Sequence, residues 1–342
     1  MKSTLYSLAA VWVLAAGTLP ATAAAADEVN LYSARKEELI KPLLDRFTEE
    51  TGIRVNLVTG KADALLKRLQ SEGRNTPADL LITTDAGRLH RARQAGLTQP
   101  VESAELQAAV PATYREPSGH WYGLSLRARP IFYARERVNA DELTRYEDLA
   151  DPKWKGRICI RSSGNIYNQS LVASMIAHGG EAQSEAWARG LVANLARTPK
   201  GGDRDQIKAA AAGECDLAVA NTYYFGGMLA GKDPAQREAA SKMAIIWPNQ
   251  GDRGTHVNVS GAAVTAHARN RENAIRLLEF LVRPESQSWY AEVNYEYPVR
   301  AGVAWSALLD QWGTFKADSL NLGQLGINNA KAVMLMDRAG WK

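Results

Sequence analysis

The chain has 342 residues, and its 41 Lys and Arg side chains against 37 Asp and Glu give a formal net charge of +4. This charge is too small to indicate a nucleic-acid-binding protein, whose surface we would expect to be strongly basic. The length exceeds what one typical hydrophobic core fills and suits a protein of two lobes.

The N-terminus has the pattern of a secretory signal peptide. Met1-Lys2 is followed by an apolar stretch over residues 5–19 and by small residues that end at Ala26. A basic start, a short apolar core and a small-residue cleavage site are typical of such peptides and not of a membrane span. We therefore predict that residues 1–26 are removed, which lowers the net charge to +3 through the loss of Lys2. The mature chain, of about 315 residues, is expected to be soluble and outside the cytoplasm.

Strands and helices alternate through the first part of the mature chain. Alternating apolar residues predict strands over residues 28–33, 53–58 and 78–83, with a helix after each strand, the third over residues 86–94. This order predicts a right-handed parallel sheet, which binds ligands at the carboxyl ends of its strands. The segments expected at that edge are residues 33–35, 60–61 and 83–87.

Two long extended passages, residues 121–133 and 254–264, predict crossings between two lobes. Pro130 prevents the first passage from being an ordinary central strand. The alternation of strands and helices resumes between the two passages, which predicts a second α/β lobe. We therefore expect a two-lobed α/β protein with a two-strand hinge, and terminal helices packed across one lobe.

Two adjacent tyrosines, Tyr223 and Tyr224, follow a predicted strand over residues 215–220 and precede Gly226-Gly227. Neighbouring side chains on a strand point to opposite faces, so two tyrosines can converge on one object only beyond the strand's end. We interpret the segment as a Gly-rich turn at the ligand edge of a sheet. The alternative is that one ring packs in the core while the other covers the surface.

The chain contains two cysteines, Cys159 and Cys215, each in or next to a predicted strand. An oxidising compartment favours a disulfide between them, and two buried thiols are the alternative. The histidines in the predicted elements and loops lack metal-ligand spacing, so we interpret them as structural. Catalytic motifs such as G-x-S-x-G are missing from the sequence, so we do not expect an enzyme.

Several segments together resemble the bacterial periplasmic ferric-ion-binding proteins of iron-uptake ABC transporters. The resemblance extends along essentially the whole mature chain, and its most specific elements are Tyr167 and the Tyr223-Tyr224 pair. The segments that carry it are residues 31–35, 127–129, 163–171, 213–216 and 221–224.

The resemblance implies a type II periplasmic-binding-protein fold that holds Fe³⁺ in the cleft between the lobes. It implies iron ligation by the phenolates of Tyr167, Tyr223 and Tyr224. It also implies a monomeric periplasmic protein that delivers iron to an ABC permease in the inner membrane. The lobes we expect are formed by residues 27–126 plus 252–301 and by residues 127–251 plus 302–342, after the signal peptide.

Many members of the family bind a synergistic anion such as carbonate, and Arg35 and Arg127 match the positions associated with it. Some relatives place His-Tyr iron ligands where this chain has Lys36-Glu37. We therefore expect an anion or water at the remaining coordination positions. Glu37 is within possible reach of the metal, although a solvated carboxylate at a helix start is the simpler interpretation.

Elementary chemistry supports phenolate ligation and gives it a test. Ferric ion is hard and highly charged, so it favours anionic oxygen donors. A free tyrosine has a pKa near ~10, so each ligand must lose a proton on binding and affinity should fall as the pH drops. A same-fold receptor for a polyamine, thiamine or a phosphonate, with an aromatic box of tyrosines, is the alternative function. Only iron ligation would give a visible charge-transfer colour.

Overall fold

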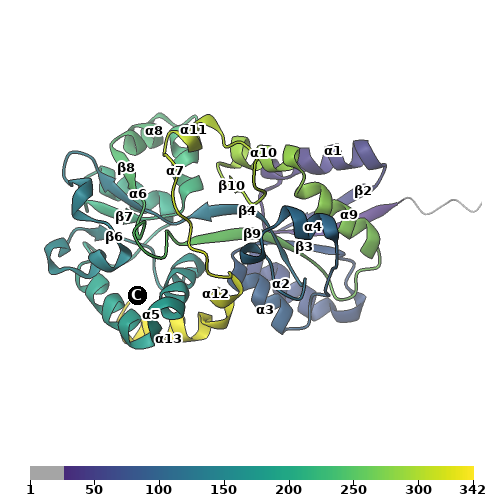
Figure 1. Ribbon diagram of the computed structural model, residues 1–342, viewed down its shortest axis with the longest axis horizontal. Coiled ribbons are helices and arrows are strands. Elements are labelled where there is room, and N and C mark those ends of the chain that lie inside the picture. Colours follow the sequence, from purple (N-terminus) through teal and green to yellow (C-terminus); the bar gives the residue numbers. More distant parts are fainter. Residues whose placement is uncertain (1–26) are drawn as a thin grey trace, which may run out of the picture.

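The computed structural model describes residues 27–342 and places the strands in two separate sheets (Figure 1). The predicted signal peptide and its cleavage site lie outside the described residues. No helix within residues 27–342 is both long enough and apolar enough to cross a membrane.

The first lobe is built on a sheet of six strands in the order β10-β4-β9-β3-β1-β2. The strand β1 pairs in parallel with both β2 and β3, which confirms the parallel arrangement expected from the strand–helix alternation. The other pairings of this sheet are antiparallel. Its strands are β1 (Glu28–Ser33), β2 (Arg54–Thr59), β3 (Leu80–Thr84), β4 (Tyr122–Ala128), β9 (Val257–Val264) and β10 (Tyr297–Pro298).

Helices cover both faces of this sheet because successive strand residues point to opposite sides. Val29 and Leu31 of β1 pack into the same core as α1 and α9, whereas Tyr32 packs with α2 on the other face. The α-helices of this lobe are α1 (Lys41–Thr51), α2 (Ala62–Glu72), α3 (Ala86–Gln94), α4 (Ala104–Ala109), α9 (Arg271–Leu281) and α10 (Pro284–Asn294). Short 3₁₀ turns are η1 (Glu37–Leu39), η2 (Gly73–Asn75) and η3 (Ala112–Tyr114).

The second lobe has a smaller sheet in the order β6-β7-β5-β8. Its strands are β5 (Ile131–Ala134), β6 (Ile158–Cys159), β7 (Leu217–Val219) and β8 (Met243–Ile246). Cys159 and Cys215 are joined by a disulfide with an S–S distance of 2.03 Å, so the predicted bridge is confirmed. The helices between these strands are α5 (Ile166–Ala193), α6 (Asp203–Ala211), α7 (Thr222–Leu229) and α8 (Pro234–Ser241), with 3₁₀ turns η4 (Ala140–Glu142), η5 (Tyr146–Ala150) and η6 (Pro152–Trp154).

The chain passes between the sheets where the sequence predicts crossings. The strand β4 of the first sheet leads through Arg129-Pro130 into β5 of the second, and β8 of the second sheet leads back to β9 of the first. The C-terminal helices α11 (Ala307–Asp310), α12 (Gly323–Ile327) and α13 (Asn329–Arg338) follow. Between α11 and α12 the chain runs across the middle of the molecule, beside the hinge (Figure 1), where Ala317 bridges to Thr255.

Two successive helices are expected over residues 171–178 and 184–196, and α5 is indeed broken into two helical parts at Gly180, whose φ of 78° is outside helical geometry. Another local feature differs from the sequence-based expectation. The Gly-rich turn expected at Gly226-Gly227 is instead the middle of helix α7. These glycines allow close packing: a Cβ at Gly226 would lie 2.6 Å from the Cβ of Tyr295.

Candidate metal centre

The three candidate tyrosines all lie in the first turns of two helices of the second lobe. Tyr167 is the second residue of α5, and the side chain of Asn165 caps that helix by accepting a hydrogen bond from the Tyr167 backbone N–H at 3.2 Å. Tyr223 and Tyr224 follow Thr222 at the start of α7. Free backbone N–H groups and the helix dipole favour negative charge at such positions, which suits a phenolate.

The tyrosine side chains converge. The hydroxyl of Tyr223 donates a hydrogen bond to the Tyr167 hydroxyl at 3.2 Å, and the rings of Tyr223 and Tyr224 lie 4.2 Å apart between centroids. All three side chains line one cavity of about 430 Å³. The helix start therefore brings both adjacent tyrosines to one cavity, which a continuing strand would not do.

This cavity lies between the two lobes. The second lobe contributes the tyrosines, Arg204 and Gly227, whereas the first lobe contributes groups from the β1–α1 connection and from the end of α10. The predicted anion-binding residues Arg35 and Arg127 both line it. Of the first-lobe carboxylates considered, Glu38 lines the cavity and Glu37 does not. Glu37 is exposed to solvent, as expected for a carboxylate at a helix start.

Surrounding protein makes these phenols hard to ionise. Burial, and after it the neighbouring Tyr167, raises the pKa of Tyr224 to about 12. The same two causes raise the pKa of Tyr223 well above its usual value, although the Arg127 guanidinium acts in the opposite direction. Both phenols are therefore protonated near neutral pH in the absence of a cation.

A network of buried polar groups supports the tyrosines from behind. Arg129 donates to Asp203 at 3.1 Å, to Asn221 at 2.9 Å and to Asn168 at 2.6 Å. Asp203 also accepts a hydrogen bond from the Asn221 backbone N–H at 2.8 Å, directly before α7 begins. Arg129 thereby ties the starts of α5, α6 and α7 together, and its guanidinium lies 6.0 Å from the Tyr167 ring.

The guanidinium groups of Arg35 and Arg127 are both paired with a carboxylate that the sequence analysis did not identify. Glu296 accepts from Arg35 Nη2 at 2.5 Å and from Arg127 Nη2 at 2.7 Å. The Ser125 hydroxyl donates to the same carboxylate at 2.5 Å. Burial would raise the pKa of Glu296, but the charges of Arg35 and Arg127 outweigh this and lower the pKa to about 2.

Sequence patterns give no signal for Glu296. It follows Tyr295, which adopts a left-handed φ of 54° at the end of α10, and it precedes the two-residue strand β10. Glu296 is separated from Arg35 by 261 positions in the chain. Only the assembled fold brings it to the arginines.

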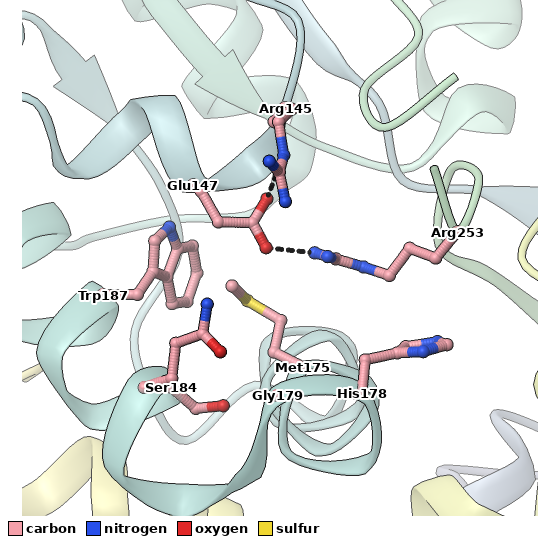
Figure 2. Close-up of a pocket in the computed structure, with 9 residues that line it drawn as sticks. Arg145, Glu147, Met175, His178, Gly179, Ser184, Trp187 and Arg253 are labelled. Carbon is pink, nitrogen blue, oxygen red and sulfur yellow. Dashed lines mark ion pairs between the residues drawn. The ribbon is translucent and has the colours of Figure 1, made fainter. Parts of the chain in front are cut away.

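A second, smaller cavity of about 170 Å³ lies in the second lobe beside α5 (Figure 2). Its charged groups pair with one another, because Glu147 contacts Arg253 at 2.7 Å and Arg145 at 3.5 Å. None of the predicted site residues lines it. The interlobe cavity is therefore the candidate site.

The model of a family described as bacterial extracellular solute-binding protein matches residues 75–314 of this chain. The chain belongs to that family. Among the extracellular solute-binding proteins that it resembles, iron uptake protein A1 of Synechocystis is 51% identical over 315 residues, which are 92% of this chain and 88% of that protein.

Solved structures show the same relationship. A Trichodesmium solute-binding protein, IdiA or FutA, in complex with iron and citrate has 50% identity and a TM-score of 0.90, over 92% of this chain and 100% of that chain. A ferric binding protein from Campylobacter jejuni has 40% identity and a TM-score of 0.87, again over 92% and 100%. These neighbours confirm the two-lobed type II fold predicted from the sequence.

Proposed function

We propose that this protein is a solute-binding protein that captures Fe³⁺ in the interlobe cavity and delivers it to an ABC permease. The ligands are the phenolate oxygens of Tyr167, Tyr223 and Tyr224. The observation that carries the proposal is the convergence of three phenols, from two helix N-termini, on one cavity between the lobes. The similarity to proteins named for ferric binding and iron uptake supports it.

The charges of the site suit a trivalent cation. Three phenolates cancel the charge of Fe³⁺, and the helix N-termini of α5 and α7 stabilise the phenolates. Phenolate is a hard anionic donor, as a hard cation requires. Because Tyr223 and Tyr224 are protonated without the metal, Fe³⁺ itself supplies the field that removes their protons.

A synergistic anion such as carbonate completes the coordination in this proposal, held by Arg35 and Arg127 of the first lobe. Arg127 has free hydrogen-bond donors, because its Nε and Nη1 atoms are buried and have no hydrogen-bond partner among residues 27–342. A charged guanidinium N–H is a donor that suits an oxyanion. An anion held there would bridge the lobes through the metal.

The family membership supports the wider setting. Solute-binding proteins of this type hand their ligand to a permease, so we propose an inner-membrane ABC permease as the partner and a monomer as the working form. We propose a periplasmic location reached through a cleaved signal peptide over residues 1–26. The lobes comprise residues 27–126 plus 252–301 and residues 127–251 plus 302–342, except that Arg127 and Ala128, as the last residues of β4, still belong to the sheet of the first lobe. Closure of the lobes on the metal is the signal to the permease. We expect no catalytic activity.

A visible spectrum of the purified protein tests the proposal. Adding ferric citrate to metal-stripped protein should produce a phenolate-to-iron charge-transfer band that saturates at one iron per chain. Tyr167→Phe, Tyr223→Phe and Tyr224→Phe should each weaken iron binding at least about a hundredfold, since each removes a charged ligand to the metal.

Tyr114→Phe is the matched control, because Tyr114 is a partly buried phenol of the first lobe that does not line the cavity. It should leave the band unchanged. A wild-type protein that stays colourless with ferric citrate would contradict the proposal.

A further inference from the structure

A buried carboxylate sits between the two arginines that face the candidate iron site. Glu296, Arg35 and Arg127 are 4%, 6% and 1% exposed, so water screens their charges little. The three side chains lie on three different segments of the first lobe: the connection after β1, the end of β4, and the connection between α10 and β10. They form one cluster with a net charge of +1.

Each arginine uses a single nitrogen for this cluster. Arg35 Nη2 donates to Glu296 and, at 2.7 Å, to the Ser125 hydroxyl. Arg127 Nη2 donates to Glu296 and to the Ser260 hydroxyl. Glu296 thus occupies one side of the Arg127 guanidinium and fixes its plane. Nε and Nη1 both stay unpartnered within the described chain, and the guanidinium lies 5.4 Å from the Tyr223 ring.

The charge count determines what this arrangement can accept. When three phenolates neutralise Fe³⁺, the net charge that remains beside the metal is the single positive charge of the cluster of Glu296, Arg35 and Arg127. One singly charged oxyanion would neutralise it. If Glu296 were uncharged, the two arginines would carry +2 beside a trivalent cation, and repulsion in a partly desolvated cavity would oppose iron binding.

We propose that Glu296 is a built-in counter-anion of the iron site. It holds Arg127 in place and reduces the need for an external anion to one small oxyanion of single negative charge, such as hydrogencarbonate, at the unpartnered N–H groups of Arg127. The inference rests on the proposed function. It adds a residue that sets how strongly iron capture depends on anions in the surroundings.

The test compares iron affinity with and without added anion. Wild type, Glu296→Gln and Glu296→Asp are titrated with ferric chloride against a competing chelator in bicarbonate-depleted buffer, then again with millimolar sodium bicarbonate, and the charge-transfer band is followed. Wild type should bind iron more tightly with bicarbonate, because one external anion still neutralises the remaining +1 charge of the cluster. Glu296→Gln should bind iron at least about tenfold more weakly without bicarbonate and regain most of the loss with it. Glu296→Asp keeps the charge and should behave like wild type.

A charge-restoring double variant separates the electrostatic role from a merely structural one. Arg35→Gln combined with Glu296→Gln returns the cluster to +1 and removes the unpaired charge that would destabilise the single variant. Because Arg35 is itself proposed to hold the anion, the quantity compared is iron affinity without bicarbonate, which should exceed that of Glu296→Gln by at least about fivefold. A purely structural role for Glu296 predicts no such recovery.

Asp216→Asn is the matched control. Asp216 also bridges two arginines, Arg137 at 2.5 Å and Arg157 at 2.6 Å, but it lies outside the interlobe cavity. It should not change the bicarbonate dependence.

The outcomes divide clearly. The inference alone is overturned if wild type shows a normal charge-transfer band and Glu296→Gln binds iron like wild type. It is also overturned if the double variant does not recover iron affinity. A wild type that develops no band with any anion overturns the proposed function and the inference with it. Sodium citrate in place of bicarbonate should rescue Glu296→Gln more strongly than wild type, because citrate carries more charge; equal effects would also count against the inference.

Discussion

Tyr223 and Tyr224 are protonated until a cation arrives, and this makes iron binding depend on pH. Burial raises the pKa of Tyr224 to about 12 and also raises that of Tyr223 well above its usual value, so each must release a proton when it binds iron. We expect the apparent affinity to fall by about tenfold per pH unit for each proton released as the pH drops from 8 to 6. Competition with a chelator of known pH dependence measures this slope. A flat profile would exclude ligation by these phenols.

Glu296 should also make the stability of the metal-free protein depend on pH. The pKa of Glu296 is about 2 in the folded state against an ordinary value of 4.5, so its contribution to stability is fully present above about pH 4.5 and is lost as the pH falls through 2. The shift corresponds to about 3 kcal/mol. In urea unfolding, the stability advantage of wild type over Glu296→Gln should therefore shrink from pH 5 to pH 2.

Glu37→Gln provides the comparison for this acid effect, because Glu37 is exposed and has no salt-bridge partner among residues 27–342. Its stability difference from wild type should stay near zero across the same range. A constant difference between wild type and Glu296→Gln at all pH values would show that the ion pairs with Arg35 and Arg127 are not its source.

At this scale the sequence predicted the tyrosines and the arginines but not Glu296. Tyr167 and the Tyr223-Tyr224 pair lie in distinctive local patterns, so their neighbours in the chain already mark them. Glu296 has no such local pattern, and its contacts with Arg35 and Arg127 exist only because the connection after α10 folds back onto β4. A buried carboxylate that neutralises two arginines is a property of the assembled site.

Helix α7 presents Tyr223 and Tyr224 because it approaches the first lobe closely at Gly226. In an isolated helix, Gly226→Ala would be favourable by up to about 1 kcal/mol. Here the added Cβ would lie 2.6 Å from the Cβ of Tyr295 and would push α7 away from the connection that carries Glu296. We expect a net loss of about 1–3 kcal/mol in stability and weaker iron binding, measured by thermal unfolding and by the charge-transfer titration.

Gly164→Ala is the control for this variant. Gly164 also lies beside a tyrosine-bearing helix, but its added Cβ would meet only the Ser162 hydroxyl at an ordinary 3.7 Å. Both measured quantities should stay close to wild type. If Gly226→Ala proved as stable as Gly164→Ala and bound iron equally well, close packing of α7 would not be what positions the tyrosines.

The elements of the first lobe were predictable, whereas those of the second lobe were less so. The helix predicted over residues 86–94 is observed as Ala86–Gln94, because several turns of apolar spacing mark it. In contrast, β6 has two residues and β7 has three, too few to establish a period. The pair Gly226-Gly227 was wrongly interpreted as a turn. The sequence does not reveal that a segment packed against this helix, at Tyr295, leaves room only for glycine at Gly226.

In the whole molecule, a third connection runs beside the two hinge crossings. The segment between α11 and α12 pairs with Thr255, whose backbone N–H donates to Lys316 at 2.8 Å and whose carbonyl accepts from Asp318 at 2.9 Å. Helix α12 then packs against α3 of the first lobe and α5 of the second. From the sequence we expected these terminal helices to pack across one lobe. A helix of five residues is too short for its periodicity to show that it contacts two partners.

This third connection should limit how far the lobes open without iron. Helix α12 lies directly on α3, because a Cβ at Gly326 would be 2.2 Å from the Cβ of His90. Gly326→Ala should therefore force α12 off α3 at a cost of about 1–3 kcal/mol. Since α12 also contacts α5, the lobes should then separate more freely.

We expect small-angle scattering to show a larger radius of gyration for the metal-free variant than for metal-free wild type. The iron-loaded forms should agree, because the metal holds both lobes. Gly251→Ala, where an added Cβ meets nothing within 4 Å, should change neither form. Hydrogen exchange should show that α12 is destabilised in Gly326→Ala. If the metal-free variant then had the same radius of gyration as metal-free wild type, the hinge strands alone would set how far the lobes open.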